Sequence, residues 1–176
     1  MKEKIIGGII VVVLGGTTFA VSQTDVVNNF ANETGMSQQQ AEEYVDKVQS
    51  DLASFDQIGT DLITDGNAIT ATATEMDCVN YAYEWESPSL SCFDGQAQLR
   101  TLGANETKLG ECYKALDADL GAGAKAKISE CITDIDAVSA SYELPIATAI
   151  MTAEELTDTR NSNAYNKSVL KSSLES

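Results

Sequence analysis

The residues with the most specific chemistry in this sequence are its four cysteines, Cys78, Cys92, Cys112 and Cys131. Cysteines in such a set either form disulfides or hold a metal ion such as zinc. Zinc sites made of four cysteines usually contain C-x-x-C pairs, and this chain has none. We therefore expect two disulfides and no bound metal, and four cysteines allow three connectivities.

Helix geometry selects one of these connectivities. Cys78 and Cys92 are placed symmetrically about Trp85, and Cys112 and Cys131 about a Gly-Ala-Gly segment. Residues equidistant from the turn of an antiparallel helical hairpin face each other. Any other pairing has to join opposite ends of one helix, about 30 Å apart, whereas a disulfide needs Cα atoms within about 7 Å. The predicted pairs are therefore 78–92 and 112–131.

The remaining side chains give little indication of a catalytic site. The chain contains no histidine, which removes the commonest general base and metal ligand. Asp117 and Asp119 are two residues apart, as are Asp134 and Asp136, and such pairs do not face each other on a helix. No phosphate-binding glycine loop is present. We therefore expect a protein that is not an enzyme and uses no cofactor.

An apolar segment opens the chain. Lys2 and Lys4 precede an uncharged run from Ile5 to Val21, and an acidic body follows it. Positive charge before an apolar run favours a cytoplasmic N-terminus, with the rest of the chain outside. The pattern predicts an N-terminal hydrophobic helix that directs export.

Two interpretations of residues 1–22 remain open. A signal peptide is consistent with the small residues around Ala20, which offer a cleavage site. A retained anchor is consistent with the length of the run and would attach the protein to a membrane. In the anchor, Gly8 and Gly15 would share one helical face and let another membrane helix approach closely.

Helical signals mark the next two short segments. Thr24–Asn32 has the spacing of a short helix, which Gly35 ends. Ser37 and Gln40 then form a capping box at the start of the following helix. We therefore expect a short helix and turn over residues 23–36, with the main body beginning at residue 37.

The main body, residues 37–176, has apolar residues spaced three, four or seven apart. This spacing predicts one helix as far as Glu84, kinked near Thr64–Asn67, because Asp-Gly and Gly-Asn favour turns. Pro88 separates it from a second helix over 89–120, and a third begins near Ala124. Pro145 either kinks the third helix or begins a fourth.

The expected fold is therefore all-α. It is an elongated antiparallel bundle of three long helices, or four if the chain reverses at Pro145. Two disulfides staple it, and the N-terminal hydrophobic helix precedes it. Scarce proline together with abundant alanine and glutamate supports long helices over a β-sandwich.

Residues 25–48, DVVNNFANETGMSQQQAEEYVDKV, resemble the first helix-turn-helix of HU-type DNA-bending proteins. The resemblance implies two short helices joined by a tight turn. The chain lacks the basic β-arms and basic surface of that family, and its formal net charge is -16. A chain this acidic repels phosphate backbones. We interpret the resemblance as shared cap-and-turn chemistry and expect no nucleic-acid partner.

Aromatic residues cluster around the first predicted turn, at Tyr81, Tyr83, Trp85 and Phe93. Trp and Tyr are favoured at the centres of protein interfaces. This tip is the candidate interaction site. The alternative is that these side chains cap the end of the bundle and cover the disulfide.

We expect a non-enzymatic structural or interaction subunit of a cell-envelope or membrane-associated assembly. It would be anchored in the inner membrane and face the periplasm, or be secreted if the N-terminal segment is cleaved. A protein partner or homo-oligomerisation follows from this hypothesis. The alternative is a periplasmic or extracellular helical bundle that binds or senses a small ligand between its helices.

Overall fold

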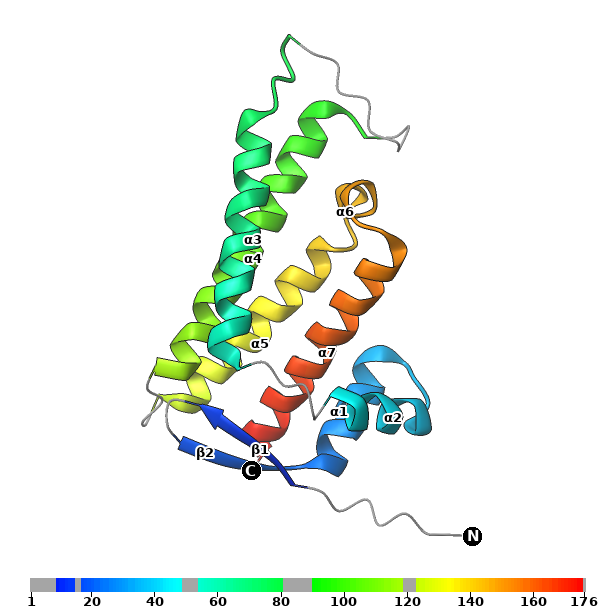
Figure 1. Cartoon of the computed structure of the whole chain (residues 1–176), viewed down its shortest axis with the longest axis vertical. Helices are drawn as coiled ribbons and strands as arrows, with labels where there is room; N and C mark the ends of the chain where they lie inside the picture. The colour runs from blue at the N-terminus through cyan, green and yellow to red at the C-terminus, as the bar shows by residue number, and fades with distance from the viewer. Residues whose placement is uncertain (1–8, 15–16, 49–53, 81–89, 119–122, 176) are drawn as a thin grey trace.

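The computed structural model describes residues 9–14, 17–48, 54–80, 90–118 and 123–175. These residues form seven helices and two strands (Figure 1). Four helices are long, and neighbours among them pack in the order α3, α4, α5 and α7. Their bounds are Phe55–Glu75, Cys92–Ala118, Ala124–Ser141 and Ala153–Glu175. The described part of the chain is therefore mostly helical, as the sequence predicts.

The predicted short helix and turn are present as α1 (Gln23–Thr34) and α2 (Gln38–Val48). Gly35 ends α1 in the left-handed conformation at φ 70°, which glycine adopts without the steric cost of a Cβ. The amide of Ser37 donates to Gln40 Oε1 at 3.1 Å, and the amide of Gln40 donates to Ser37 Oγ at 3.4 Å. The predicted capping box is therefore confirmed.

The N-terminal segment differs from the hydrophobic helix expected there. Ile9–Leu14 and Thr17–Ser22 form the antiparallel strands β1 and β2, with Ile9 opposite Ser22 and Leu14 opposite Thr17. Ile, Val and Thr are abundant in these strands, and their branched side chains favour strands over helices. Two such runs on either side of a Gly-Gly pair are the pattern of a hairpin. Among the described helices, none is both long enough and apolar enough to cross a membrane.

The single helix expected between Ser37 and Glu84 is also not found. Its first part is α2, and a separate helix, α3, begins after Ser54, whose hydroxyl accepts the amide of Gln57 at 3.1 Å. The kink expected near Thr64–Asn67 is absent, because α3 runs through these residues without interruption. The Asp-Gly and Gly-Asn pairs form no turn here, because Gly66 lies inside α3 and packs against the backbone of α4.

The chain reverses after Pro145, so a fourth long helix is present. Pro145 begins the short helix α6 (Pro145–Ile150), and α7 follows. Arg160 Nη2 donates to the carbonyl oxygen of Tyr142 at 3.1 Å, close to the reversal. At the other end, Lys125 Nζ donates to the carbonyl oxygen of Leu174 at 3.3 Å. These contacts show that α5 and α7 run antiparallel.

The main core lies where α1, α4, α5 and α7 meet. The aromatic ring of Phe30 stacks on Tyr44 with centroids 4.7 Å apart, and its edge approaches Tyr165. Phe55 packs edge-on against Tyr113 at 5.0 Å. The fully buried aliphatic members include Val26, Val27, Leu102, Leu109, Leu116, Val138 and Leu170. A second, smaller cluster lies apart from this core, at the far end of α3 and α4.

Two pairs of glycines bring the backbones of α3 and α4 into direct contact. A Cβ atom on Gly66 would lie 2.5 Å from the carbonyl oxygen of Gly103, and one on Gly103 would lie 2.5 Å from that of Gly66. Gly59 and Gly110 are related in the same way, at 2.6 Å in each direction. Only glycine permits this approach, because any other residue would place a side-chain atom against the opposing backbone. The reciprocal pairs also fix the antiparallel register of the two helices.

We predict that Gly66→Ala destabilises the protein, although alanine is the better helix former by about 1 kcal/mol. The new methyl group meets backbone atoms that cannot move aside alone, and overpacking of this kind typically costs about 1–3 kcal/mol. Urea unfolding followed by circular dichroism measures the change. Gly123→Ala is the control, because no atom lies within 4 Å of its added Cβ. A Gly66→Ala variant as stable as the wild type would show that the helices do not touch here.

Candidate functional site

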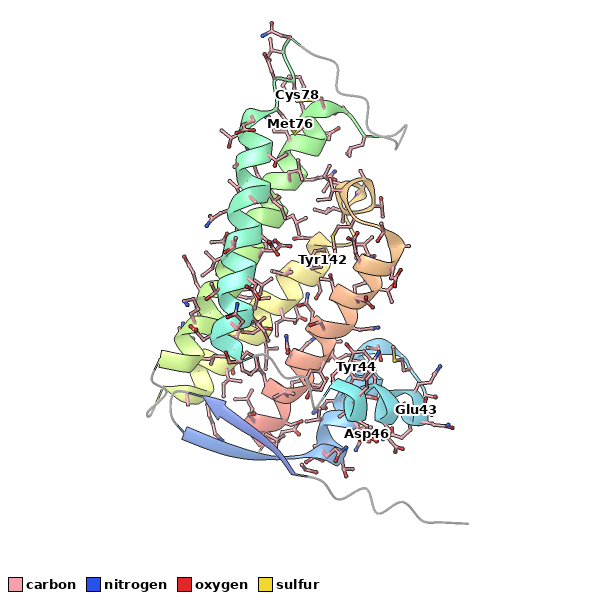
Figure 2. The ribbon with its side chains drawn as sticks, in the orientation of Figure 1. Glu43, Tyr44, Asp46, Met76, Cys78 and Tyr142 are labelled. Atoms are coloured by element: carbon pink, nitrogen blue, oxygen red, sulfur yellow. A yellow bond between two sulfur atoms is a disulfide. The ribbon has the colours of Figure 1, made fainter. Side chains whose placement is uncertain are left out.

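The structure joins Cys78 to Cys92 and Cys112 to Cys131, with Cα atoms 5.6 and 5.5 Å apart. This is the connectivity predicted from helix geometry. The two bonds have different surroundings. Cys112 and Cys131 are buried in the main core, where they tie α4 to α5. Cys78 and Cys92 are half-buried and close the far end of the α3–α4 hairpin (Figure 2).

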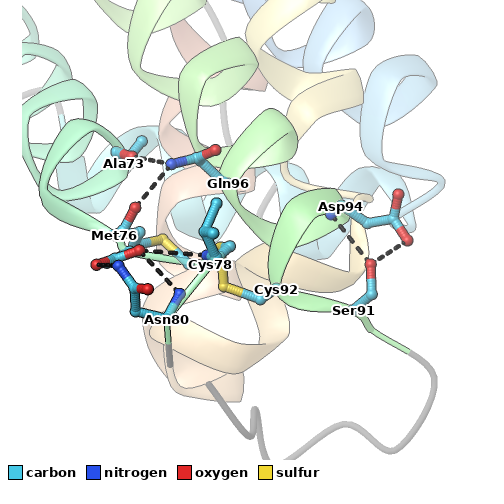
Figure 3. Close-up of a disulfide and its surroundings, with 10 residues drawn as sticks. Ala73, Met76, Cys78, Asn80, Ser91, Cys92, Asp94 and Gln96 are labelled. Atoms are coloured by element: carbon cyan, nitrogen blue, oxygen red, sulfur yellow. Dashed lines mark hydrogen bonds between the residues drawn. A yellow bond between two sulfur atoms is a disulfide. The ribbon is translucent and has the colours of Figure 1, made fainter. Parts of the chain in front are cut away.

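Hydrogen bonds hold the end of α3 against α4 beside the Cys78–Cys92 disulfide (Figure 3). Gln96 Nε2 donates to the carbonyl oxygen of Ala73 at 2.8 Å and to that of Met76 at 3.1 Å. The last carbonyls of a helix have no partner within it. Gln96, which belongs to α4, therefore caps the C-terminal end of α3.

The chain segments on either side of the disulfide have caps of their own. Asp77 Oδ1 accepts the backbone amides of Val79 at 3.2 Å and Asn80 at 3.1 Å. Hydrogen bonds from the side chain and backbone of Asn80 lower the pKa of Asp77, so this carboxylate stays ionised at neutral pH. Ser91 Oγ accepts the amide of Asp94 at 3.2 Å at the start of α4. The described segments on the two sides of residues 81–89 are therefore both held by hydrogen bonds close to the disulfide.

The smaller apolar cluster lies at this end of the molecule. It consists of Ala73, Met76, Leu90, Leu99 and Ile146. The short helix α6 covers its side, and the amide of Ile146 donates to Gln98 Oε1 at 3.0 Å. The half-buried disulfide also packs against it.

Three large apolar side chains remain exposed around this cluster: Val79 at 82%, Phe93 at 59% and Ile150 at 41%. They come from the segment after α3, the first turn of α4 and the end of α6. No other large hydrophobic side chain in the described ranges is exposed to this extent. We call Val79, Phe93 and Ile150 the distal apolar face.

Only one residue of the predicted interaction tip belongs to the described part of the chain. Phe93 belongs to the distal apolar face, whereas Tyr81, Tyr83 and Trp85 lie outside the described residues. Gly8 and Gly15, the predicted membrane-helix contacts, also lie outside them. Val79 and Ile150 were missed. Ile150 continues the helical spacing of buried residues, and nothing in the sequence marks that α6 ends there and leaves it exposed.

A buried carboxyl group lies between α4 and α5. Glu106 is only 4% exposed, and its Oε1 accepts the hydroxyl of Tyr142 at 2.5 Å, while its Oε2 has no hydrogen-bond partner. Burial and the negative charge of Asp65 raise the pKa of Glu106, although the Tyr142 hydrogen bond opposes them. Glu106 lines neither of two clefts on this molecule, of about 320 and 160 Å³.

The smaller cleft, of about 160 Å³, is lined in part by Cys112. Two ion pairs line it, Lys108 with Asp134 at 2.7 Å and Lys127 with Glu130 at 2.7 Å. The hydrogen bond to Asp134 raises the pKa of Lys108, and that from Lys127 lowers the pKa of Glu130. The Lys108–Asp134 pair links α4 to α5, whereas Lys127 and Glu130 both lie on α5.

Within the described ranges, no three His, Cys, Asp or Glu side chains are grouped to hold a metal ion. Comparison of the chain with protein-family models, curated protein sequences and solved structures finds no match. Its function is therefore inferred from the side chains and geometry described above.

We predict that a mild reductant opens Cys78–Cys92 before Cys112–Cys131, because exposed disulfides are reduced more readily than buried ones. Alkylation under native conditions followed by peptide mapping gives the order. Alkylated Cys112 or Cys131 at the earliest times would contradict the burial assigned to them. A link between Cys78 and Cys112 would contradict the connectivity itself.

We predict that Glu106→Gln stabilises the protein increasingly as the pH rises. Because its folded pKa is raised, Glu106 contributes stability that is fully present below the unfolded pKa and lost as the pH rises through the folded value. Glutamine cannot ionise and still accepts the Tyr142 hydroxyl. Urea unfolding between about pH 4 and about pH 7 measures the difference from wild type. Glu111→Gln, at an exposed position of α4, is the control, and a pH-independent difference would refute the assignment.

Proposed function

We propose that this protein is a non-enzymatic interaction subunit of an assembly outside the cytoplasm, and that the distal apolar face binds a protein partner. One observation carries the proposal. The exposed large apolar side chains of the described chain gather at one end, around a small cluster and a half-buried disulfide. Scattered exposed apolar residues are ordinary, but a localised group of them is typical of an interaction site.

The elongated antiparallel α3–α4 hairpin supports this role because it presents the face on a stiff support. The glycine pairs hold the two backbones together along the hairpin, and the Cys78–Cys92 disulfide closes its end. A preordered surface loses less conformational entropy on binding than a mobile one. The hairpin extends past α5 and α7 in Figure 1.

Charge indicates the chemistry of the partner. The charged residues beside the face on the α3–α4 side are Glu75, Asp77 and Asp94, and all three are acidic. Complementary charge speeds association and excludes wrong partners. The proposed partner therefore has an apolar patch bordered by lysine or arginine. A second copy of this chain fits poorly, since each copy carries a formal net charge of -16.

The disulfides support a location outside the cytoplasm, because such bonds persist in oxidising compartments and are rare in reducing ones. Each closes a loop, of 14 or 19 residues in sequence separation, and contributes about 3 kcal/mol in the chain-entropy model. That contribution is present only where the thiols stay oxidised.

We predict that the double substitution Val79→Ser with Phe93→Ser abolishes partner binding without changing thermal stability. Both side chains are exposed, so the fold loses little, whereas an interface that buries them loses at least ~100-fold in affinity. Affinity purification of the tagged full chain with mass spectrometry identifies the partner, and titration of that partner measures the loss.

Ala104→Ser, at an exposed position midway along α4, serves as the matched control. A partner retained by the wild type and this control but lost by the double variant supports the proposal. A partner that binds all three proteins equally would place the interface elsewhere.

A further inference from the structure

A second candidate site lies away from the distal apolar face, in a cleft between α5, α7 and the C-terminal end of α1. Its volume is about 320 Å³, which is within the range of small-molecule sites. α5 contributes Asp136 and Ser139 to it, and α7 contributes Arg160, Asn161 and Lys167. The cleft is lined by charges of both signs, unlike the apolar end of the hairpin.

Arg160 forms one end of the cleft and has a donor to spare. Its Nη2 lies 2.9 Å from Glu143 Oε1 and donates to the carbonyl oxygen of Tyr142. Its Nη1 has no hydrogen-bond partner among the described residues, and the side chain is 40% exposed. A guanidinium carries five N–H donors in a fork that matches a carboxylate. This end of the cleft is therefore suited to a ligand carboxylate.

Lys167 forms the other end, where it bridges two carboxylates. Its Nζ lies 2.7 Å from Glu33 Oε2 and 2.6 Å from Asp136 Oδ1, and Lys171 also pairs with Glu33. Burial disfavours the charged forms of Lys167 and Glu33. The hydrogen bonds between these opposite charges outweigh this effect, so the pKa of Lys167 is raised and that of Glu33 is lowered. Asp136 uses only Oδ1 in its ion pair, and an ionised carboxylate can accept several hydrogen bonds. It therefore keeps capacity for a cationic group.

Two uncommitted polar side chains lie between these ends. Ser139 on α5 and Asn161 on α7 are half-buried, and neither side chain hydrogen-bonds to another described residue. They offer a hydroxyl and an amide to the middle of a bound molecule. Both can therefore hydrogen-bond to a ligand without breaking a contact with another described residue.

We propose that this cleft binds a small zwitterion, such as a free amino acid or a betaine. The lining carries three carboxylates, Glu33, Asp136 and Glu143, and two cations, Arg160 and Lys167. A dianion would face the carboxylates and a dication the cations, whereas a zwitterion places each charge beside its opposite. Its carboxylate lies at Arg160 and its cationic group beside Asp136.

Isothermal titration of the full chain tests the proposal with defined probes. Single amino acids, an ω-amino acid and glycine betaine are the zwitterions, and succinate and putrescine are the matched dianion and dication. We expect saturable binding of at least one zwitterion and of neither control. Binding of succinate or putrescine alone, or of no probe, would overturn the proposal. Among the zwitterions, binding of amino acids but not betaine would show that ammonium N–H donors are required.

Variants locate the bound probe. Arg160→Gln should weaken binding roughly ten-fold or more, because it removes a charge-assisted hydrogen bond. Ser139→Ala should weaken it less, and Ser162→Ala, the same change at an exposed α7 position outside the cleft, should leave it unchanged. If Arg160→Gln does not fold, Ser139→Ala and Asn161→Ala decide the question. Equal binding by these two and by Ser162→Ala would place the ligand elsewhere.

Discussion

Backbone contact between α3 and α4 is the constraint on which the distal end of this molecule depends. α3 packs mainly on α4, so its position is set by how closely those two helices approach. Each interior glycine costs a helix roughly 0.5–1 kcal/mol relative to alanine. Here that cost is offset by close packing of two long helices, which permits weak Cα–H···O contacts and many dispersion contacts. The glycine pairs also set the register that brings Cys78 beside Cys92.

The two ends of the molecule differ in how much of their apolar surface is buried. The main core, the buried Cys112–Cys131 bond and the aromatic contacts of Phe30 lie together, where α1, α4, α5 and α7 meet. The smaller cluster at the other end is closed by a half-buried disulfide and surrounded by exposed apolar side chains. We therefore expect substitutions of the exposed side chains at the distal end to affect folding less than substitutions in the main core.

The sequence predicted features with a local physical cause. Caps at Gly35 and Ser37 and the disulfide pairing all depend on short-range geometry, and the structure contains each of them. At Pro145 the sequence left a kink and a new helix open, and the structure has the new helix. Features that depend on distant neighbours were missed. Gly66 has the sequence surroundings of a turn, and only Gly103, far along the chain, makes it part of a helix contact. The N-terminal segment, predicted to be a hydrophobic helix from its apolar length, forms strands instead, which its abundant β-branched residues favour.

The charged cleft could not be predicted either, because Glu33, Asp136 and Arg160 come from α1, α5 and α7 and no spacing in the sequence relates them.

The Cys78–Cys92 staple has an evolutionary consequence. Loss of either cysteine would leave its partner as a half-buried free thiol that can form unwanted disulfides. The two positions are therefore under joint selection, and a lineage retains or abandons both together.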